Sequence, residues 1–270
     1  MNKEYKVEKK QAGIRIDEFA YLNGISKKAL KKIKMNGEIF VNGVHQTVRY
    51  IIQDKDKIQF FYPEEISKIE AEDIDFDIVY EDEYLMVIDK PKGIPCVPTR
   101  TYPSHTLVNA IMGYYKKKGI SSTVHLVNRL DKDTSGLMLI AKYRDIHHSF
   151  SKDIKQVKRV YHTYVLGNIG EGTVNLPIYK VDKQMRRIID ERGKKSITHY
   201  RALKYEEGIS LVECHLETGR THQIRVHLSA IGYPLIGDSL YGGVEGEFFL
   251  DSVEISFFHP IYQKYIHLKK

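Results

Sequence analysis

Residues 125–142 read HLVNRLDKDTSGLMLIAK, a run of charged and hydroxyl side chains between two apolar segments. The apolar segments predict two strands joined by a polar bend. Asp131 stands in this bend, with Arg129 two residues before it and Lys132 directly after it. Because residues two apart share a face of an extended segment, we expect Arg129 and Asp131 to point into one cleft. A carboxylate held near cations stays ionised and is able to act as a nucleophile or a base.

The residues of this run leave four interpretations open. A turn in which an aspartate caps the following backbone is the default for Asp-x-Asp-Thr-Ser-Gly. A metal or phosphoryl-transfer site at Asp131 and Asp133 normally follows a fully apolar strand, whereas Asn128 and Arg129 precede it here. A nucleophilic Ser135 lacks the Gly-x-Ser-x-Gly elbow. The fourth interpretation gives Asp131 a covalent or glycosidic role in a nucleoside site.

A second polar run, ETGRTHQIRVHL at residues 217–228, leads into a predicted helix at 222–231. Arg220 lies beside the start of this helix, where arginine and threonine favour phosphate binding. His222 and His227 are five residues apart, not the four of a helical zinc pair, and no acidic residue lies between them. We therefore expect no metal here, and taken alone the run is a structural cluster.

Composition places the chain among globular proteins. Its 270 residues are 42% apolar, and no run approaches the roughly 18 apolar residues that a membrane-spanning helix needs. The charged residues 1–6 have no apolar core behind them, so they predict no secretory signal. The chain has two cysteines, Cys96 and Cys214, which argues against a disulfide framework or a cysteine zinc site. We expect a cytoplasmic protein with free thiols.

Charge is distributed unevenly along the chain. The formal net charge is +7, with an excess of Lys and Arg in residues 1–60 and an excess of acids in residues 61–80. This shift predicts a basic module at 1–62, an acidic linker at 63–75 and a larger domain at 76–270. Short apolar strands and helical patches do not alternate strictly in the larger domain. They predict an α+β fold with a mixed, mainly antiparallel central sheet flanked by helices and loops, preceded by a small α+β domain. Helices are expected at 107–117, 146–155 and 222–231.

The basic module is predicted to begin with two short helices and to end in a hairpin. The inward face of the first helix is expected to hold Ile16, Phe19, Ala20 and Leu22. Ser26 is a suitable N-cap for the second helix, and Gly37 ends it. Asn42-Gly43 is a strong hairpin turn, and a closing strand follows at 57–60.

The second helix carries four lysines on its polar side. They lie in two pairs one turn apart, Lys27 with Lys31 and Lys28 with Lys32. Like charges at this spacing cost helix stability, which a bound polyanion would offset; a solvated face is the alternative. The order of helix, lysine-rich helix, Val41-Asn42-Gly43 turn and strand resembles the ribosomal-protein-S-four-type RNA-binding domain. The resemblance implies that these lysines bind RNA. Lys27 stands where that family usually has arginine.

The larger domain resembles the RluA family of pseudouridine synthases over nearly all of residues 76–260. The family's motifs occur in its order, as Lys90-Pro91-Lys92-Gly93, RLDKDTSGL at 129–137, Arg159-Val160-Tyr161, Val165-x-Gly167, Gly193-Lys194-x-Ser196-x-Thr198, TGRTHQIRVH at 218–227, Gly237-Asp238-x-x-Tyr241-Gly242 and His259-Pro260. The central motif is long and specific. The resemblance implies an enzyme that converts uridine in RNA to its carbon-linked isomer without cofactor or metal.

The resemblance also implies roles for single residues. Asp131 matches the nucleophile, which either assists loss of uracil from the sugar or adds to the uracil ring. Tyr161 matches the tyrosine that packs on the flipped base and takes the ring proton, and Arg225 matches the arginine that ion-pairs with the nucleophile. Arg129 is suited to filling the gap that the extruded nucleotide leaves. RNA contacts are also expected from Arg220 and His222.

Four residues, at three places in the sequence, depart from the family's pattern. Asn128 replaces the usual histidine, and we expect it to change RNA contacts. Asp89 replaces a common asparagine, and Asp251-Ser252 replaces a usual His-Ala; we expect both to be peripheral.

The prediction is a cytoplasmic, monomeric RNA pseudouridine synthase that binds no membrane and acts on ribosomal RNA, with transfer RNA as the other candidate. A non-catalytic RNA-binding or ribosome-assembly factor is the alternative from another class. A hydrolytic nucleosidase is the third hypothesis, and no second carboxylate is evident for it.

Overall fold

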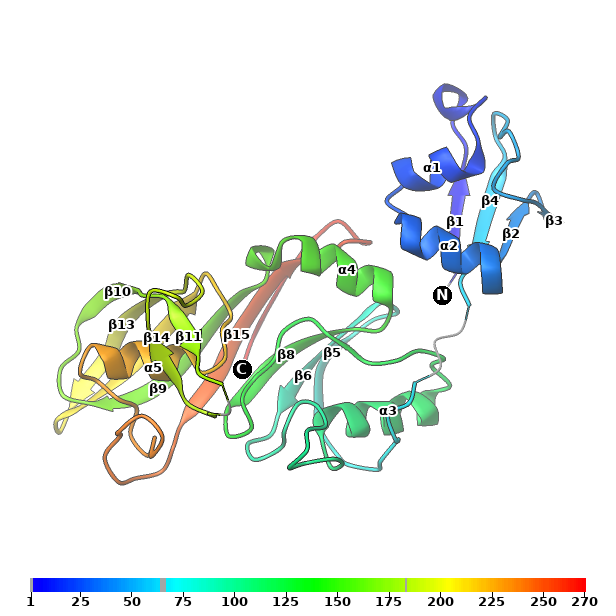
Figure 1. Cartoon of the computed structure of the whole chain (residues 1–270). Helices are drawn as coiled ribbons and strands as arrows, with labels where there is room; N and C mark the ends of the chain where they lie inside the picture. Colours follow the sequence, from blue (N-terminus) through cyan, green and yellow to red (C-terminus); the bar gives the residue numbers. More distant parts are fainter. Residues whose placement is uncertain (1, 64–66, 183) are drawn as a thin grey trace. The chain divides into compact units, whose positions relative to one another are not determined.

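The computed structural model describes residues 2–63, 67–182 and 184–270, and its contacts divide the chain into two compact units. Unit 1 comprises Met1–Lys68 with Ile120–Thr123, and unit 2 comprises Ile69–Gly119 with Val124–Lys270. Figure 1 shows the chain coloured from blue at its N-terminus to red at its C-terminus. Each unit has its own sheet and its own buried core.

Unit 1 is a four-stranded antiparallel sheet in the order β1-β4-β2-β3, with two helices (Figure 1). Its elements are β1 (Asn2–Lys6), the 3-10 turn η1 (Lys9–Gln11), α1 (Ile16–Leu22), α2 (Lys27–Asn36), β2 (Glu38–Val41), β3 (Val44–His45) and β4 (Lys57–Phe61). The sequence did not predict β1, which pairs along the whole of β4. Asn42 and Gly43 take the positive φ values, 53° and 81°, that a tight hairpin turn requires.

Local sequence explains where the helices of unit 1 begin and which face they bury. The Ser26 hydroxyl accepts a hydrogen bond from the Ala29 backbone N–H (3.1 Å) and so caps α2, as predicted. Ile16, Phe19 and Ala20 of α1 are buried in the core of unit 1. The prediction for Leu22 was wrong, because this last residue of α1 is 70% exposed.

Unit 2 is built on a ten-stranded mixed sheet, which confirms the predicted α+β fold. Its path runs β10-β13-β14-β9-β15-β8-β6-β5, with β16 paired to β15 and β7 paired to β8. The strands are β5 (Asp77–Glu81), β6 (Leu85–Lys90), β7 (His125–Leu126), β8 (Ser135–Ala141), β9 (Lys158–Leu166), β10 (Glu171–Asn175), β13 (Ile197–Glu206), β14 (Ile209–Leu216), β15 (Leu250–Phe258) and β16 (Tyr265–Lys269). A separate two-stranded ribbon joins β11 (Ile178–Lys180) to β12 (Arg187–Ile189).

Strand β15 joins the two halves of this sheet. It pairs antiparallel with β9 on one side and parallel with β8 on the other (Figure 1). The parallel pairing is short, between Asp251 and Ser135 and between Ser252 and Gly136. The strand that joins the two halves therefore follows the strands of both halves, β5–β10, β13 and β14, in the sequence.

Helices of unit 2 lie close to where the sequence predicted them. They are α3 (Leu107–Lys118), α4 (Arg144–Lys152), the 3-10 turn η2 (Ile154–Gln156) and α5 (Gln223–Ala230). The acidic segment expected as a linker includes residues 64–66, which lie outside the described residues. From Glu70 onward it packs on α3, because Asn109 Nδ2 donates to the Glu70 carbonyl (2.8 Å) and Glu72 N donates to the Asn109 carbonyl (3.0 Å).

Candidate active site

A pocket of about 420 Å³ in unit 2 brings the two polar runs together. Asp131 enters it from the loop between β7 and β8, Tyr161 from β9, and Arg225 from α5. Of the residues that the sequence singled out, the pocket lining holds Arg129, Asp131, Tyr161, Arg220, His222 and Arg225. The predicted cleft shared by Arg129 and Asp131 is therefore present. The lysines of α2 belong to unit 1, where Lys27, Lys28 and Lys31 are exposed and Lys32 is half-buried.

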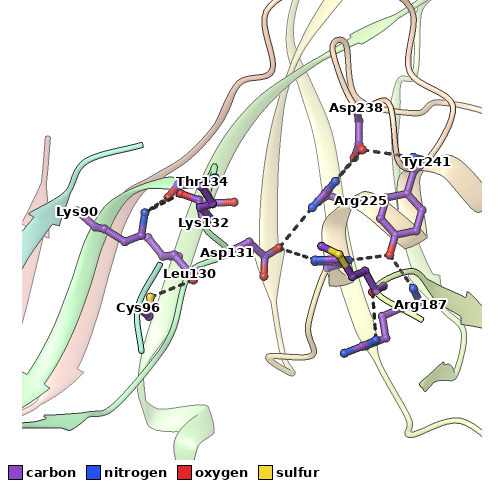
Figure 2. A network of polar contacts seen from close by, with 12 residues as sticks. Lys90, Cys96, Leu130, Asp131, Lys132, Thr134, Arg187, Arg225, Asp238 and Tyr241 are labelled. Carbon is purple, nitrogen blue, oxygen red and sulfur yellow. Dashed lines mark hydrogen bonds and ion pairs between the residues drawn. The ribbon is translucent and has the colours of Figure 1, made fainter. Parts of the chain in front are cut away.

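The loop that presents Asp131 is held by a buried lysine. Lys90 Nζ donates to the carbonyl oxygens of Lys132 (3.0 Å) and Thr134 (2.9 Å) (Figure 2). It also donates to the Pro91 carbonyl (2.7 Å), and the side chain is fully buried. Burial lowers the pKa of this ammonium group. The Cys96 thiol donates to the Leu130 carbonyl at 3.0 Å. The three contacts to the carbonyls of Leu130, Lys132 and Thr134 thus fix the loop without using the Asp131 carboxylate.

Arg225 is the cation nearest to the Asp131 carboxylate, but its tight partner is another acid. Its Nε and Nη2 donate to the two oxygens of Asp238 at 2.7 and 2.8 Å, whereas Nη1 lies 3.9 Å from Asp131 Oδ2. The guanidinium also lies over the rings of Tyr241 (5.1 Å) and Phe248 (5.2 Å). Figure 2 shows Arg225 between the two carboxylates. The expected pairing of Arg225 with Asp131 is therefore a looser contact than its pairing with Asp238.

His222 approaches Asp131 from the other side. Its Nε2 lies 3.8 Å from Asp131 Oδ2, and its Nδ1 lies 2.8 Å from the Tyr241 hydroxyl. The backbone N–H of Arg187 donates to that hydroxyl (2.8 Å), so the Tyr241 proton is free to point at Nδ1. Nδ1 then accepts, and the neutral ring carries its proton on Nε2, facing Asp131. Burial lowers the pKa of His222, which agrees with a neutral ring.

The Asp131 carboxylate is not a backbone cap. Among residues 69–119, 124–182 and 184–270 of unit 2, the polar partners of its carboxylate are Arg225 and His222. The turn closes through its backbone instead, because Thr134 N donates to the Asp131 carbonyl at 3.2 Å. Ser135 does not line the pocket, and its hydroxyl donates to Asp251 Oδ1 at 2.6 Å. These contacts leave the Asp131 carboxylate open to the pocket.

Tyr161 forms part of the buried floor of the pocket. It is 4% exposed and pairs in register with Ser252 of β15. Burial raises the pKa of its phenol, the Arg159 guanidinium lowers it, and the Ser252 side chain interacts with it. The phenol is therefore protonated at neutral pH in the free protein.

The four residues that depart from the family pattern have structural roles that the sequence did not predict. Ser252 was expected to be peripheral, yet it is fully buried beside Tyr161. Asn128 was expected to alter RNA contacts, yet it is 5% exposed and its Oδ1 accepts from Leu139 N at 2.8 Å. Asp89 and Asp251 both bind the Lys270 ammonium. All of these side chains hold strands together, which single-residue substitution patterns do not reveal.

Among the described residues, no group of three or more His, Cys, Asp or Glu side chains is arranged to hold a metal ion. None of the helices in the same residues has the length and apolar character needed to cross a membrane.

Known proteins resemble this chain over most of its length. Residues 84–230 match the family described as RNA pseudouridylate synthase. The chain is 42% identical to the uncharacterized RNA pseudouridine synthase YjbO of Bacillus subtilis, over 92% of each protein. It is 35% identical to ribosomal large subunit pseudouridine synthase D of Salmonella typhimurium, over 88% of this chain and 75% of the relative.

A solved structure gives the same architecture. Human RNA pseudouridylate synthase domain containing 4 superposes with a TM-score of 0.59, covering 72% of this chain and 87% of that one. The two sequences are 23% identical, so this likeness concerns the fold alone.

Proposed function

Because the chain belongs to the RNA pseudouridylate synthase family, as an enzyme of the RluA group, we propose that it isomerises uridines of ribosomal RNA with Asp131 as the nucleophile. One observation carries the choice of Asp131: its carboxylate faces a pocket beside Tyr161, 3.9 Å from Arg225 and 3.8 Å from His222. The choice of ribosomal RNA rests on relatives named for the large ribosomal subunit. We also propose that it acts in the cytoplasm as a monomer without a cofactor.

The reaction needs an anionic nucleophile at a base that has left the RNA stack. The bond from sugar to uracil nitrogen must break, the base must turn, and a bond to ring carbon must form. Asp131 either bonds to the sugar as uracil leaves or adds to the uracil ring. In both cases the cationic Arg225 and the Nε2–H of His222 face the reacting carboxylate of Asp131.

The remaining pocket residues divide the other tasks. Tyr161 supplies a buried ring against which the flipped base packs, and in a later step it accepts the proton that the ring carbon loses. Because burial raises the pKa of its phenol, Tyr161 is protonated in the free protein and must lose its own proton before it acts as a base. The exposed Arg129 lies at the pocket, where its side chain fills the gap that the flipped nucleotide leaves.

A map of pseudouridine in all cellular RNA tests this function. We expect one or a few ribosomal RNA positions to lose pseudouridine completely in cells that lack the protein, and to regain it when the wild-type gene is restored. Loss confined to transfer RNA would overturn the choice of substrate. A map that does not change would instead favour a non-catalytic RNA-binding factor on the same fold.

Unit 1 is proposed to bind RNA phosphates through the lysines of α2. The support is geometric: Lys27, Lys28 and Lys31 are exposed on the helix, while Ala29, Leu30 and Ile33 face the core. The first turn of this helix holds no acidic residue to offset the lysines. The polar side of α2 therefore presents an anion-binding surface.

Neutralising two of these lysines is expected to lower the salt dependence of RNA binding. In Lys27→Gln/Lys31→Gln, the slope of log affinity against log salt should fall by roughly 0.7 to 0.9 for each lysine that contacts a phosphate. The measurement is a binding titration at several salt concentrations. Lys9→Gln/Lys55→Gln makes the same change of charge elsewhere in unit 1 and should keep the wild-type slope. Equal slopes for all three proteins would rule out this surface.

A further inference from the structure

Arg159 is a buried cation on strand β9. It is 5% exposed, and its Nε is buried without a hydrogen-bond partner. The structure gives its side chain no ion pair with any acid among residues 69–119, 124–182 and 184–270 of unit 2, in contrast to the bidentate pairing of Arg225. Burying an unpaired charge costs several kcal/mol by general estimate. We therefore expect the guanidinium of Arg159 to be paired by a group of a ligand that enters the protein from solvent.

The position of Arg159 points it at the substrate pocket. It stands two residues before Tyr161 on β9, so both side chains leave the same face of the strand, and both line the pocket. Gly219 leaves room for the guanidinium, because a Cβ at that position would lie 3.0 Å from Arg159 Nη1. Arg159 lowers the pKa of the Tyr161 phenol, which places its charge close to that ring.

Depth in the pocket indicates which part of a nucleotide meets Arg159. Arg159 and Tyr161 are buried, whereas the side chain of Asp131 is 26% exposed. Asp131 must reach the bond between sugar and base, so the sugar and its phosphates lie toward the opening. The base then extends inward over Tyr161. The ring position farthest from the glycosidic nitrogen is C4, which in uracil bears the carbonyl oxygen O4.

We propose that Arg159 recognises uracil by donating a hydrogen bond to O4 and stabilises the negative charge that this oxygen gains during the reaction. This inference rests on the proposed function. If Asp131 attacks the sugar, the electron pair of the broken bond passes to the uracil ring, including O4. If Asp131 adds to ring carbon C6, the electrons of the C5–C6 double bond move toward O4. A fixed guanidinium beside O4 favours both routes.

The same contact selects uridine over cytidine. Cytosine bears an amino group at C4, which would set a donor against the N–H groups of Arg159 and leave both unpaired. A site built to hydrogen-bond one substrate group rejects analogues that lack it. Arg159 is therefore a specificity residue as well as a catalytic one.

Arg159→Met in the full chain tests the proposal, with Lys158→Met as the matched control. Lys158 is the exposed neighbour on β9, so the control makes the same change of charge. Binding is measured with Asp131→Asn also present, to prevent turnover. The probes are an RNA hairpin with the mapped uridine and its copy with cytidine there. We expect a preference for uridine of about tenfold or more in the parent and the control, and near-equal binding with Arg159→Met.

Three further readouts separate this role from others. With Asp131 intact, Arg159→Met should slow single-turnover pseudouridine formation by roughly 100-fold or more. Its melting temperature without RNA should equal or exceed that of the wild type, because an unpaired buried charge is removed. A marked fall in melting temperature would assign Arg159 a structural role and overturn the proposal.

An RNA phosphate, in place of uracil O4, is the alternative partner for Arg159. It would weaken binding of the uridine and cytidine hairpins equally and lower the salt slope by roughly 0.7 to 0.9, and that result would also overturn the proposal. Unchanged rate and preference with Arg159→Met would reject the proposal while leaving pseudouridine formation by this protein intact. The proposed function fails separately, if the wild-type protein modifies no uridine.

Discussion

Asp131→Asn is expected to abolish pseudouridine formation, with a loss of at least about 1000-fold in single-turnover rate. An amide of the same shape is neutral and does not form the covalent bond that the reaction needs. The fold should tolerate the change, because the loop is fixed by backbone contacts to Lys90 and Thr134. RNA binding should stay within a few-fold of wild type. The measurement is pseudouridine formed on the mapped RNA with enzyme in excess.

A neighbouring carboxylate supplies the control for this experiment. Asp133 is exposed and lies two residues along the same loop, so Asp133→Asn removes one negative charge without touching the pocket. It should keep most of the activity. Turnover by Asp131→Asn would show that the nucleophile lies elsewhere, and an equal loss in both variants would mean that the loop tolerates no change of charge.

Arg225→Met is expected to cost about 3 to 5 kcal/mol of stability as well as activity. The side chain of Asp238 is fully buried, and its two oxygens both accept from Arg225. Without the guanidinium, this carboxylate remains inside the protein with no cation to balance it. Methionine keeps the apolar contacts with Tyr241 and Phe248, so the loss reports the charge and its hydrogen bonds. Urea denaturation measures the free energy of unfolding.

The double variant Arg225→Met/Asp238→Asn separates stability from catalysis. Replacing the unpaired Asp238 carboxylate by an amide should restore most of the free energy of unfolding, because a neutral amide costs less to bury. Activity should not return, since the guanidinium that faces the Asp131 carboxylate is then missing. Recovery of both properties would reduce Arg225 to a structural role. A single variant as stable as wild type would contradict the ion pair with Asp238.

Sequence patterns predicted those parts of the fold that depend on short-range chemistry. Ser26 caps α2, and Asn42-Gly43 turns the hairpin, because each needs only neighbouring backbone groups. Strand β1 was missed because its residues, Asn2–Lys6, are mostly polar and it becomes a strand by pairing with β4. Leu22 fits the apolar face of α1 by periodicity, but it lies at the end of the helix, where no neighbour covers it.

The site was predicted residue by residue, but not as a network. The motifs supplied Asp131, Tyr161 and Arg225, and all three line one pocket. No spacing rule indicated that Arg225 binds Asp238 more tightly than Asp131, because a loop sets that contact. Likewise, Arg159 looked like one basic residue of a motif until its burial, with no hydrogen bond to its Nε among the described residues, distinguished it.

The placement of β15 has a consequence for protein synthesis. This strand lies between β9, which bears Tyr161, and β8, which follows the Asp131 loop. While the ribosome is still making the chain, the two half-sheets have no strand to join them, so the pocket has no complete wall. Unit 1 consists of Met1–Lys68 and Ile120–Thr123, so all of its residues are synthesised well before β15. We expect it to fold first, since domains generally fold in the order in which they leave the ribosome. We therefore expect the pocket of a nascent chain to be completed only after β15, which ends at residue 258, has left the exit tunnel of the ribosome.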